Sequence, residues 1–244
     1  MADTGFDILI PYHGQYKLVR ELIGSICLFT RHIPYRITVI DDASENKDYF
    51  YTIAQLPNID GARHEEQRGF GAAVNTGIKL TKRPWIVVLN SDCLIEEMSW
   101  LDELYKTMVA LKDQKVRFVS ARTDNPTSGD ATLLKTPRID RKDIGDVVSS
   151  APLPMFCTLL SRKMVEQVGP LKEYPFGFYE DEEYFYRMKR LGFKQAVSGK
   201  AWVKHLGGVT VQELWERKPE TKNVMLVENR QRCMKDVKPS FGGR

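Results

Sequence analysis

The sequence contains few cysteines, and those it has are scattered. Cys27, Cys93, Cys157 and Cys233 form no CxxC pair and no metal-ligand spacing, which argues against zinc ribbons and dithiol redox motifs. Reduced thiols in a cytosolic compartment are the simplest interpretation. The sequence also lacks an apolar run near the ~20 residues that span a bilayer. No basic region and apolar core precede the strand-like sequence at Phe6, so we expect no signal peptide and a cytoplasmic protein.

A strong charge of one sign is also missing. The formal net charge is only +4, which is too small to indicate a nucleic-acid partner. The charge is uneven, however, because residues 217–244 hold eight Lys or Arg against three Asp or Glu. A solvated basic helix is the favoured interpretation of this C-terminal end. Peripheral contact with a membrane is the alternative.

The sequence carries neither of two common phosphate-binding signatures. The segment QRGFGAAVNTGI at 67–78 is a glycine-bearing turn that runs into a helix, but it has no GK[ST] and does not fit GxGxxG. Its small residues are equally typical of a helix that packs closely against a neighbour. Arg68 is a candidate to meet a phosphate, and Asn75 is a candidate to join the helix to a nearby loop.

Four short apolar segments predict a buried sheet. Residues 6–11, 35–41, 84–90 and 116–121 are almost continuously apolar, as in parallel strands that are covered on both faces. Apolar residues at helical spacing predict amphipathic helices between them. These residues are Leu18, Leu22, Ile26 and Phe29 in one helix and Met98, Leu101, Leu104, Met108 and Leu111 in another. The alternation predicts an α/β protein with a Rossmann-like, mostly parallel sheet flanked by helices.

The pattern loosens after residue 121. Residues 122–150 are rich in Asp, Thr, Gly and Pro, which is typical of a functional loop or lid. The sequence then predicts an apolar stretch at 152–160, a short helix at 162–168, an acidic-aromatic block at 175–191, a strand pair within 194–205 and a C-terminal helix near 212–234.

Polar residues follow three of the predicted strands. They are Pro11-Tyr12-His13-Gly14, Asp41-Asp42-Ala43-Ser44 and Asn90-Ser91-Asp92. Ligands of open α/β sheets gather at the carboxyl ends of the strands. Carboxylates there bind either the donor groups of a nucleotide or a hard cation that bridges its phosphates. For the second group the alternative is a turn with a helix N-cap, since Asp and Ser favour both.

Four consecutive acids, Glu180 to Glu183, follow an aromatic-glycine turn and open a helix. Attraction to the helix dipole accounts for one or two of them. Mutual repulsion of the rest is expected to raise a carboxyl pKa, which suits a general base. The neighbouring rings suit the flat face of a sugar, and Arg187 is placed to pair with Glu183. His205 is either structural or, as neutral imidazole near Asp92, a ligand of Mn²⁺ or Mg²⁺.

These motifs, in this order, resemble the inverting GT-A glycosyltransferases of family 2, and most closely a rhamnosyltransferase-like branch. The resemblance runs from about Asp7 to Gly208. The matching segments are the first strand ending in Pro11, VIDDAS (39–44), RGFGAAVNTGI (68–78), LNSD (89–92), GFYEDEEYFYR (177–187) and HLGG (205–208).

The resemblance implies a role for each candidate residue. Nucleotide-binding residues would be Pro11, Tyr12, Asp41, Asp42, Arg68, Asn75, Asn90 and Ser91. Asp92 and His205 would hold Mn²⁺ or Mg²⁺, with Asn90 standing where the family has the first acid of its DxD motif. Asp181 would be the catalytic base, flanked by Glu180 and Glu182. Because Glu183 replaces a usual Asp, Glu182 stays open as the base.

The implied enzyme transfers a sugar, with inversion, from a UDP- or dTDP-sugar to a hydroxyl of a glycan or glycolipid; rhamnose is one candidate sugar. Residues 1–210 would form the GT-A domain, with a nucleotide-sugar half (1–121) and an acceptor half (122–210), and residues 211–244 a basic C-terminal helix and tail. The alternative is a catalytically degenerate module that binds a glycan or nucleotide. A nucleotidyltransferase is less well supported, because PYHGQYKLVRE (11–21) supplies no glycine- and basic-rich phosphate loop.

Overall fold

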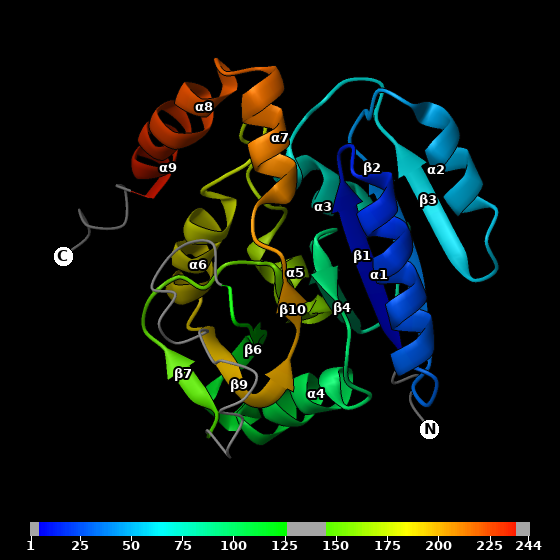
Figure 1. Ribbon diagram of the computed structural model, residues 1–244. Helices are drawn as coiled ribbons and strands as arrows, with labels where there is room; N and C mark the ends of the chain where they lie inside the picture. The colour runs from blue at the N-terminus through cyan, green and yellow to red at the C-terminus, as the bar shows by residue number, and fades with distance from the viewer. Residues whose placement is uncertain (1–4, 126–144, 238–244) are drawn as a thin grey trace.

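An eight-stranded mixed sheet runs through the centre of the protein (Figure 1). The computed structural model describes residues 5–125 and 145–237. The strand order is β3-β2-β1-β4-β8-β6-β9-β7, and a second small sheet pairs β10 with β5. The strands are β1 (Phe6–Tyr12), β2 (Tyr35–Asp41), β3 (Ile59–Arg63), β4 (Trp85–Leu89), β5 (Cys93–Leu94), β6 (Val116–Arg122), β7 (Val147–Ser149), β8 (Cys157–Ser161), β9 (Lys194–Trp202) and β10 (Lys204–His205).

The first half of the sheet is the parallel unit that the sequence predicts. β1 pairs in parallel with β2 and β4, and β2 pairs in parallel with β3. Helix α1 (Tyr16–Phe29) lies in front of these strands in Figure 1, and α3 (Phe70–Leu80) lies behind them. Every residue of β1 is buried, which explains its continuous apolar character. The predicted α/β fold with a mostly parallel sheet is confirmed.

The second half of the sheet changes direction at β8. This strand runs antiparallel to both β4 and β6. Beyond it, β6 and β9 are parallel, and β7 is an antiparallel strand at the edge. The remaining helices are α2 (Lys47–Ala54), α4 (Trp100–Ala110), α5 (Arg162–Val168), α6 (Glu180–Arg190), α7 (Val209–Arg217), α8 (Thr221–Asn223) and α9 (Asn229–Val237), with a 3₁₀ turn at Lys112–Gln114 and a π-helical segment at Val224–Glu228.

The amphipathic pattern places the predicted helices with one correction. Helix α1 buries Leu22 and Ile26 against the sheet, as expected. In the second helix, however, Met98 precedes the first turn and is 57% exposed. The residue that anchors the start of α4 is instead Trp100, which is fully buried and donates its indole N–H to Thr30 Oγ1 at 3.0 Å.

Two predicted elements near the C-terminus differ from the structure. The strands within 194–205 do not pair with each other, because β9 has β6 and β7 on its two edges and β10 leaves the sheet to pair with β5. The single helix predicted near 212–234 is broken, because Pro219 has no N–H to continue α7. Of the predicted loop 122–150, residues 126–144 lie outside the described residues, and the rest includes β7.

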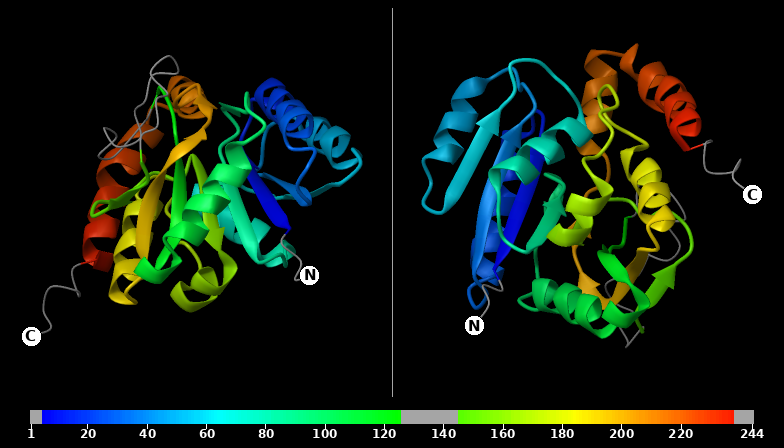
Figure 2. Two further views of the ribbon diagram at one scale, coloured as in Figure 1. Left: turned by 90° about the horizontal axis from the view of Figure 1, so that it is seen from below. Right: turned by 180° about the vertical axis from the view of Figure 1, so that it is seen from behind.

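The broken C-terminal helices fold back over the second half of the molecule. Figure 2 shows α9 lying alongside α6, and the two helices are in contact. No helix within residues 5–125 and 145–237 combines the length and apolar character needed to cross a bilayer.

Candidate active site

A cavity of about 810 Å³ opens at the carboxyl ends of β1 and β4. Its wall is made by Pro11 and Tyr12 of β1, by Asn90, Ser91 and Asp92 after β4, by residues 152–156, by the start of α6, and by His205 with α7. The topology therefore brings the first and third polar strand ends together with the acidic block. These segments are far apart in the sequence, so the cavity exists only in the folded chain.

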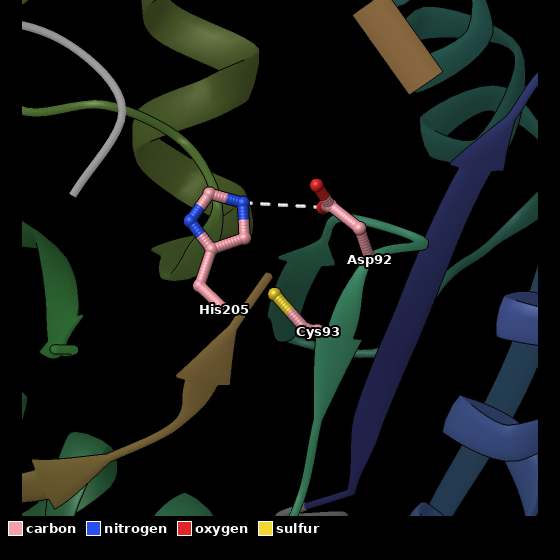
Figure 3. Close-up of side chains that lie close together, drawn as sticks. All are labelled: Asp92, Cys93 and His205. Carbon is pink, nitrogen blue, oxygen red and sulfur yellow. Dashed lines mark hydrogen bonds and ion pairs between the residues drawn. The ribbon is translucent and has the colours of Figure 1, made fainter. Parts of the chain in front are cut away.

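The small sheet places Asp92 against His205 (Figure 3). In the β5–β10 ladder, His205 is the register partner of Cys93, and Leu206 N–H donates to the Asp92 carbonyl at 2.9 Å. This register sets His205 Nε2 3.1 Å from Asp92 Oδ1, while Gly208 N–H donates to Oδ2 at 2.9 Å. Burial acts to raise the Asp92 pKa, but the hydrogen bonds from His205 and Gly208 outweigh it and hold the pKa below its ordinary value. Asp92 is therefore a carboxylate at neutral pH.

The hydrogen-bonding groups around His205 fit a cation site. Its Nδ1 lies 3.1 Å from the carbonyl oxygen of Asn125, and its Nε2 faces the Asp92 carboxylate. Both neighbours are acceptors, whereas a neutral imidazole has one N–H. The arrangement is satisfied either by a doubly protonated ring or by a cation between Nε2 and the carboxylate. Asn90 Oδ1, at the same rim, is buried and has no hydrogen-bond partner among the described residues.

Cys93 completes a group of three side chains whose ligand atoms lie within 4.8 Å of one another. Burial and the nearby Asp92 carboxylate raise the pKa of its thiol well above the ordinary value. The thiol donates to the Phe156 carbonyl at 3.4 Å, so its proton is engaged. Oxygen and nitrogen ligands suit Mn²⁺ and Mg²⁺ better than a protonated thiol. The pair that fits a hard cation is therefore Asp92 and His205, and Asn90, whose unpaired Oδ1 is described above, borders the same cavity.

The acids at the start of α6 differ in protonation. Burial raises the pKa of Glu180 to about 8 and that of Asp181 to about 6. Backbone hydrogen bonds oppose the shift at both residues, including one from Glu182 N–H to Asp181 Oδ1 at 2.9 Å. At neutral pH Glu180 is mostly protonated and Asp181 mostly ionised. Of these two cavity-lining acids, Asp181 is the one able to accept a proton. Glu182 also lines the cavity.

An unusual turn brings these acids to the cavity. Phe176, Gly177, Phe178 and Tyr179 all have φ between 62° and 105°, the left-handed region that non-glycine residues rarely adopt. The turn packs against the start of α3. A Cβ on Gly69 would lie 2.7 Å from the Tyr174 carbonyl oxygen, and one on Gly71 would clash with Lys172. The glycines of the 67–78 segment therefore permit close packing, as one of the two interpretations of that segment expected.

The second strand end is occupied by internal contacts. Asp41 is fully buried and accepts from Ser44 and Arg63. Asp42 reaches the cavity wall, but its carboxylate accepts from the backbone N–H groups of Arg68 and Gly69 at 2.9 and 2.7 Å and contacts His64. Both acids thus hold the loops that frame the cavity. Only Asp42 of the pair borders the space that a nucleotide would fill.

Two other predicted nucleotide-binding residues lie away from the cavity wall. The Arg68 guanidinium pairs with Glu173 at 2.7 Å on the surface. The Asn75 side chain exchanges two hydrogen bonds with the Leu171 backbone, at 2.9 and 2.8 Å, and donates to Glu173. Asn75 therefore joins α3 to a nearby loop, as the sequence suggested. The internal bonds of both side chains give no support to a direct nucleotide contact.

The sequence reasoning missed several residues of the cavity. Gln67 borders the cavity, and its Oε1 has no hydrogen-bond partner among the described residues. The hydroxyl of Tyr12 has none there either. Trp215 of α7 stacks on Phe178, with ring centroids 6.3 Å apart. A polar residue beside a glycine turn was the available signal for Gln67. Nothing in the local sequence pointed from Trp215 to a turn that lies earlier in the chain.

Comparison with solved structures confirms the GT-A fold. GalNAc-T7, solved with UDP, GalNAc and Mn²⁺, superposes with a TM-score of 0.67 at 15% identity, over 83% of this chain and 44% of that protein. The mannosyltransferase PcManGT from Pyrobaculum calidifontis, in complex with GDP-Man and Mn²⁺, gives 0.60 at 16% identity, over 82% and 56%. The chain thus spans about half the length of these structures.

A comparison with curated proteins finds no match. Residues 7–169, however, match the family model of glycosyl transferase family 2. The match includes Asp92 and the parallel half of the sheet and ends before α6, whereas the rhamnosyltransferase-like branch remains a prediction. Because the matched region is well over half of the sequence, the chain belongs to glycosyl transferase family 2.

Proposed function

We propose that this protein transfers a sugar, with inversion, from a nucleoside-diphosphate sugar to a hydroxyl of a glycan or glycolipid. The observation that carries the proposal is one cavity lined both by the Asp92–His205 pair and by Asp181, whose pKa burial raises to about 6. One part is suited to a cation with its diphosphate, and the other is suited to remove a proton. The match to the family 2 model supports the donor part of this combination, since it includes Asp92.

Donor binding is assigned to the half of the cavity built by residues 1–121. Tyr12 and Gln67 each present a buried polar atom with no partner among the described residues, and Pro11, Asp42 and Ser91 border the same space. Unpaired buried polar atoms are costly unless a ligand or water satisfies them. UDP- and dTDP-sugars, with rhamnose among the sugars, remain the candidate donors.

Acceptor chemistry is assigned to the half built by residues 122–210. Asp181 takes the proton of the acceptor hydroxyl. The hydroxyl oxygen forms a bond to the anomeric carbon as the bond from that carbon to the diphosphate breaks, and the electron pair leaves with the nucleoside diphosphate. Attack opposite the leaving group inverts the configuration. Phe178 and Trp215 line the cavity near the start of α6 and present the apolar surface that the face of a sugar requires.

Asp92 and His205 are the residues that would hold Mn²⁺ or Mg²⁺, together with the side-chain Oδ1 of Asn90. Bound there, the ion supplies Lewis-acid stabilisation of the charge that develops on the diphosphate. The Gly208 N–H keeps Asp92 oriented, and the Asn125 carbonyl keeps His205 Nε2 turned toward it. Such outer contacts fix the ligand atoms and tune their basicity.

The test is a thermal-shift panel of UDP, dTDP, GDP, CDP and CMP, each with and without Mn²⁺. A hundredfold excess over the dissociation constant stabilises the native state by about 2.7 kcal/mol. We expect a Mn²⁺-dependent shift with one nucleoside diphosphate that is lost in Asp92→Asn. The control is Asp60→Asn, which changes a carboxylate of the surface pair with Arg36 and leaves the cavity intact. An equal shift in both variants would refute the metal assignment.

Transfer assays then separate the enzyme from the degenerate binding module. We expect Asp181→Asn to abolish transfer while the Mn²⁺-dependent nucleotide shift survives. Loss of transfer in Glu182→Gln, with activity retained in Asp181→Asn, would move the base to Glu182. Nucleotide binding without transfer in the wild-type protein, across a panel of sugar nucleotides and acceptors, would favour the binding module.

A further inference from the structure

The left-handed turn before α6 needs an external restraint. In this turn, residues 175–179, Phe176, Phe178 and Tyr179 have positive φ although their side chains disfavour it. Within the turn, only Gly177 suits this region of backbone space. Residues in such conformations persist when surrounding contacts hold them. The structure shows where those contacts come from.

Asn229, the first residue of α9, reaches into this turn. Its side-chain amide donates to the carbonyl oxygen of Pro175 at 2.9 Å and to that of Gly177 at 2.7 Å. Asn229 is fully buried, so water does not compete for these bonds. A primary amide has two N–H donors on one nitrogen, and here each meets a different carbonyl of the same turn. One side chain therefore sets the spacing of two carbonyls in the turn.

Further contacts join the same two regions of the chain. The Tyr174 hydroxyl donates to Asp236 Oδ2 at 2.8 Å, and the Tyr179 hydroxyl donates to the Leu226 carbonyl at 3.3 Å. Tyr174, Cys233 and Val237 form a small apolar cluster beneath these bonds. The C-terminal helices thus pack along the turn on a buried surface and add to the hold of Asn229.

We propose that Asn229 is a positioning residue that holds the turn 175–179 and so keeps Asp181 aimed into the cavity. The turn leads directly into α6, whose second residue is Asp181. Asn229 lies beyond the segment that matches the family model, within the residues 211–244 that are predicted from the sequence to form a basic C-terminal helix and tail. The inference rests on the proposed role of Asp181, and it makes the C-terminal helices part of the catalytic unit.

The test compares Asn229→Ala with Thr221→Ala in the full chain. Thr221 is also buried in the C-terminal helices, and its hydroxyl donates to the Lys218 carbonyl at 2.7 Å, but it does not contact the turn. Hydrogen exchange of the amides from 176 to 185 reports the hold on the turn without reference to activity. Tyr174→Phe removes the neighbouring bond to Asp236 and serves as a milder second variant, since Tyr174 is not part of the cavity wall.

In Asn229→Ala we expect amide exchange from 176 to 185 to rise at least tenfold and kcat to fall about ten- to a hundredfold, the loss that follows misplacement of a reacting group by about 1 Å. The Mn²⁺-dependent nucleotide shift should stay within about twofold in affinity. Tyr174→Phe should show smaller changes in the same direction, and Thr221→Ala none. These results would support the assignment.

Unchanged exchange in Asn229→Ala would overturn the proposal whatever the activity. An equal loss of kcat and of nucleotide affinity would also overturn it, because that pattern indicates general disruption rather than a misplaced base. Faster exchange in Asn229→Ala together with full transfer by Asp181→Asn would refute the base assignment while supporting the hold of Asn229 on the turn. Failure of the two proposals is thereby distinguishable.

Discussion

Glu180 offers a test of the electrostatics of the site that needs no substrate. The residue is 2% exposed, and burial raises the pKa of its carboxyl group from 4.5 to about 8. A raised carboxyl pKa means that the folded state binds the proton more tightly than the unfolded chain does. Below pH 4.5 both states are protonated and nothing is lost. Between 4.5 and 8 the unfolded chain releases the proton first, so stability falls as pH rises.

The size of the effect follows from the two pKa values. One pKa unit corresponds to about 1.4 kcal/mol, so Glu180 lowers the free energy of unfolding by about 3 kcal/mol at pH 7 and by about 1 kcal/mol at pH 5. Gln has a similar shape and does not titrate. The stability of Glu180→Gln relative to wild type should therefore rise by about 3 kcal/mol between pH 5 and pH 8.

Urea unfolding at pH 5, 6, 7 and 8 measures this difference. Any change in packing caused by the amide is the same at each pH, so the slope against pH isolates the carboxyl group. The matched control is Glu182→Gln, which removes an acid from the same helical turn and leaves Glu180 in place. It should change the slope less than Glu180→Gln does, because the charge of Glu182 is a smaller cause of the raised Asp181 pKa than burial is. Parallel stability curves for wild type and Glu180→Gln would refute the reasoning.

Two further predictions concern packing and proton transfer. Gly71→Ala should destabilise the protein by about 1–3 kcal/mol in urea unfolding, because the added Cβ would clash with Lys172. The control, Gly24→Ala on the open side of α1, should be neutral or stabilise the protein by up to about 1 kcal/mol. Equal effects of the two substitutions would contradict the close-packing account. The kcat/KM for transfer should rise with pH and reach half its plateau near pH 6, the pKa of Asp181, since the ionised form accepts the proton. A midpoint near pH 4 would indicate an unperturbed carboxylate and argue against a base with a raised pKa.

The parallel half of the fold follows closely from the sequence. Strand β2 begins and ends at the predicted residues 35 and 41, and outside the parallel half helix α5 matches the predicted 162–168. Both have short, clear apolar patterns with definite ends. The sequence reasoning did not assign strand β3, because its segment IDGAR alternates weakly and contains only short or polar side chains after Ile59. Its strand conformation is supported by pairing with β2.

The site could be predicted as residue types and strand ends, but not as contacts. Asp92 and His205 were expected to lie together, and they do, because the β5–β10 register aligns Cys93 with His205. The acids of α6 were expected to have raised pKa values through mutual repulsion. The larger cause is burial in the folded chain, which a local count of charges does not show. Asp41 and Asn75 were predicted to bind the nucleotide, but in the structure their side chains form hydrogen bonds within the protein. The sequence alone did not indicate these partners.

Residue 210 is a natural boundary by composition, since the family-like motifs end at Gly208 and basic residues dominate soon after. Side-chain contacts nevertheless cross this boundary. Trp215 stacks on Phe178 in the cavity wall, and Asn229 holds the carbonyls of the turn before α6. A chain that ended at 210 would leave that turn in left-handed conformations without the amide that satisfies it. The basic charge pattern therefore describes only the exposed face of the C-terminal helices. Their buried face packs against the turn that leads to Asp181 and belongs to the same structural unit.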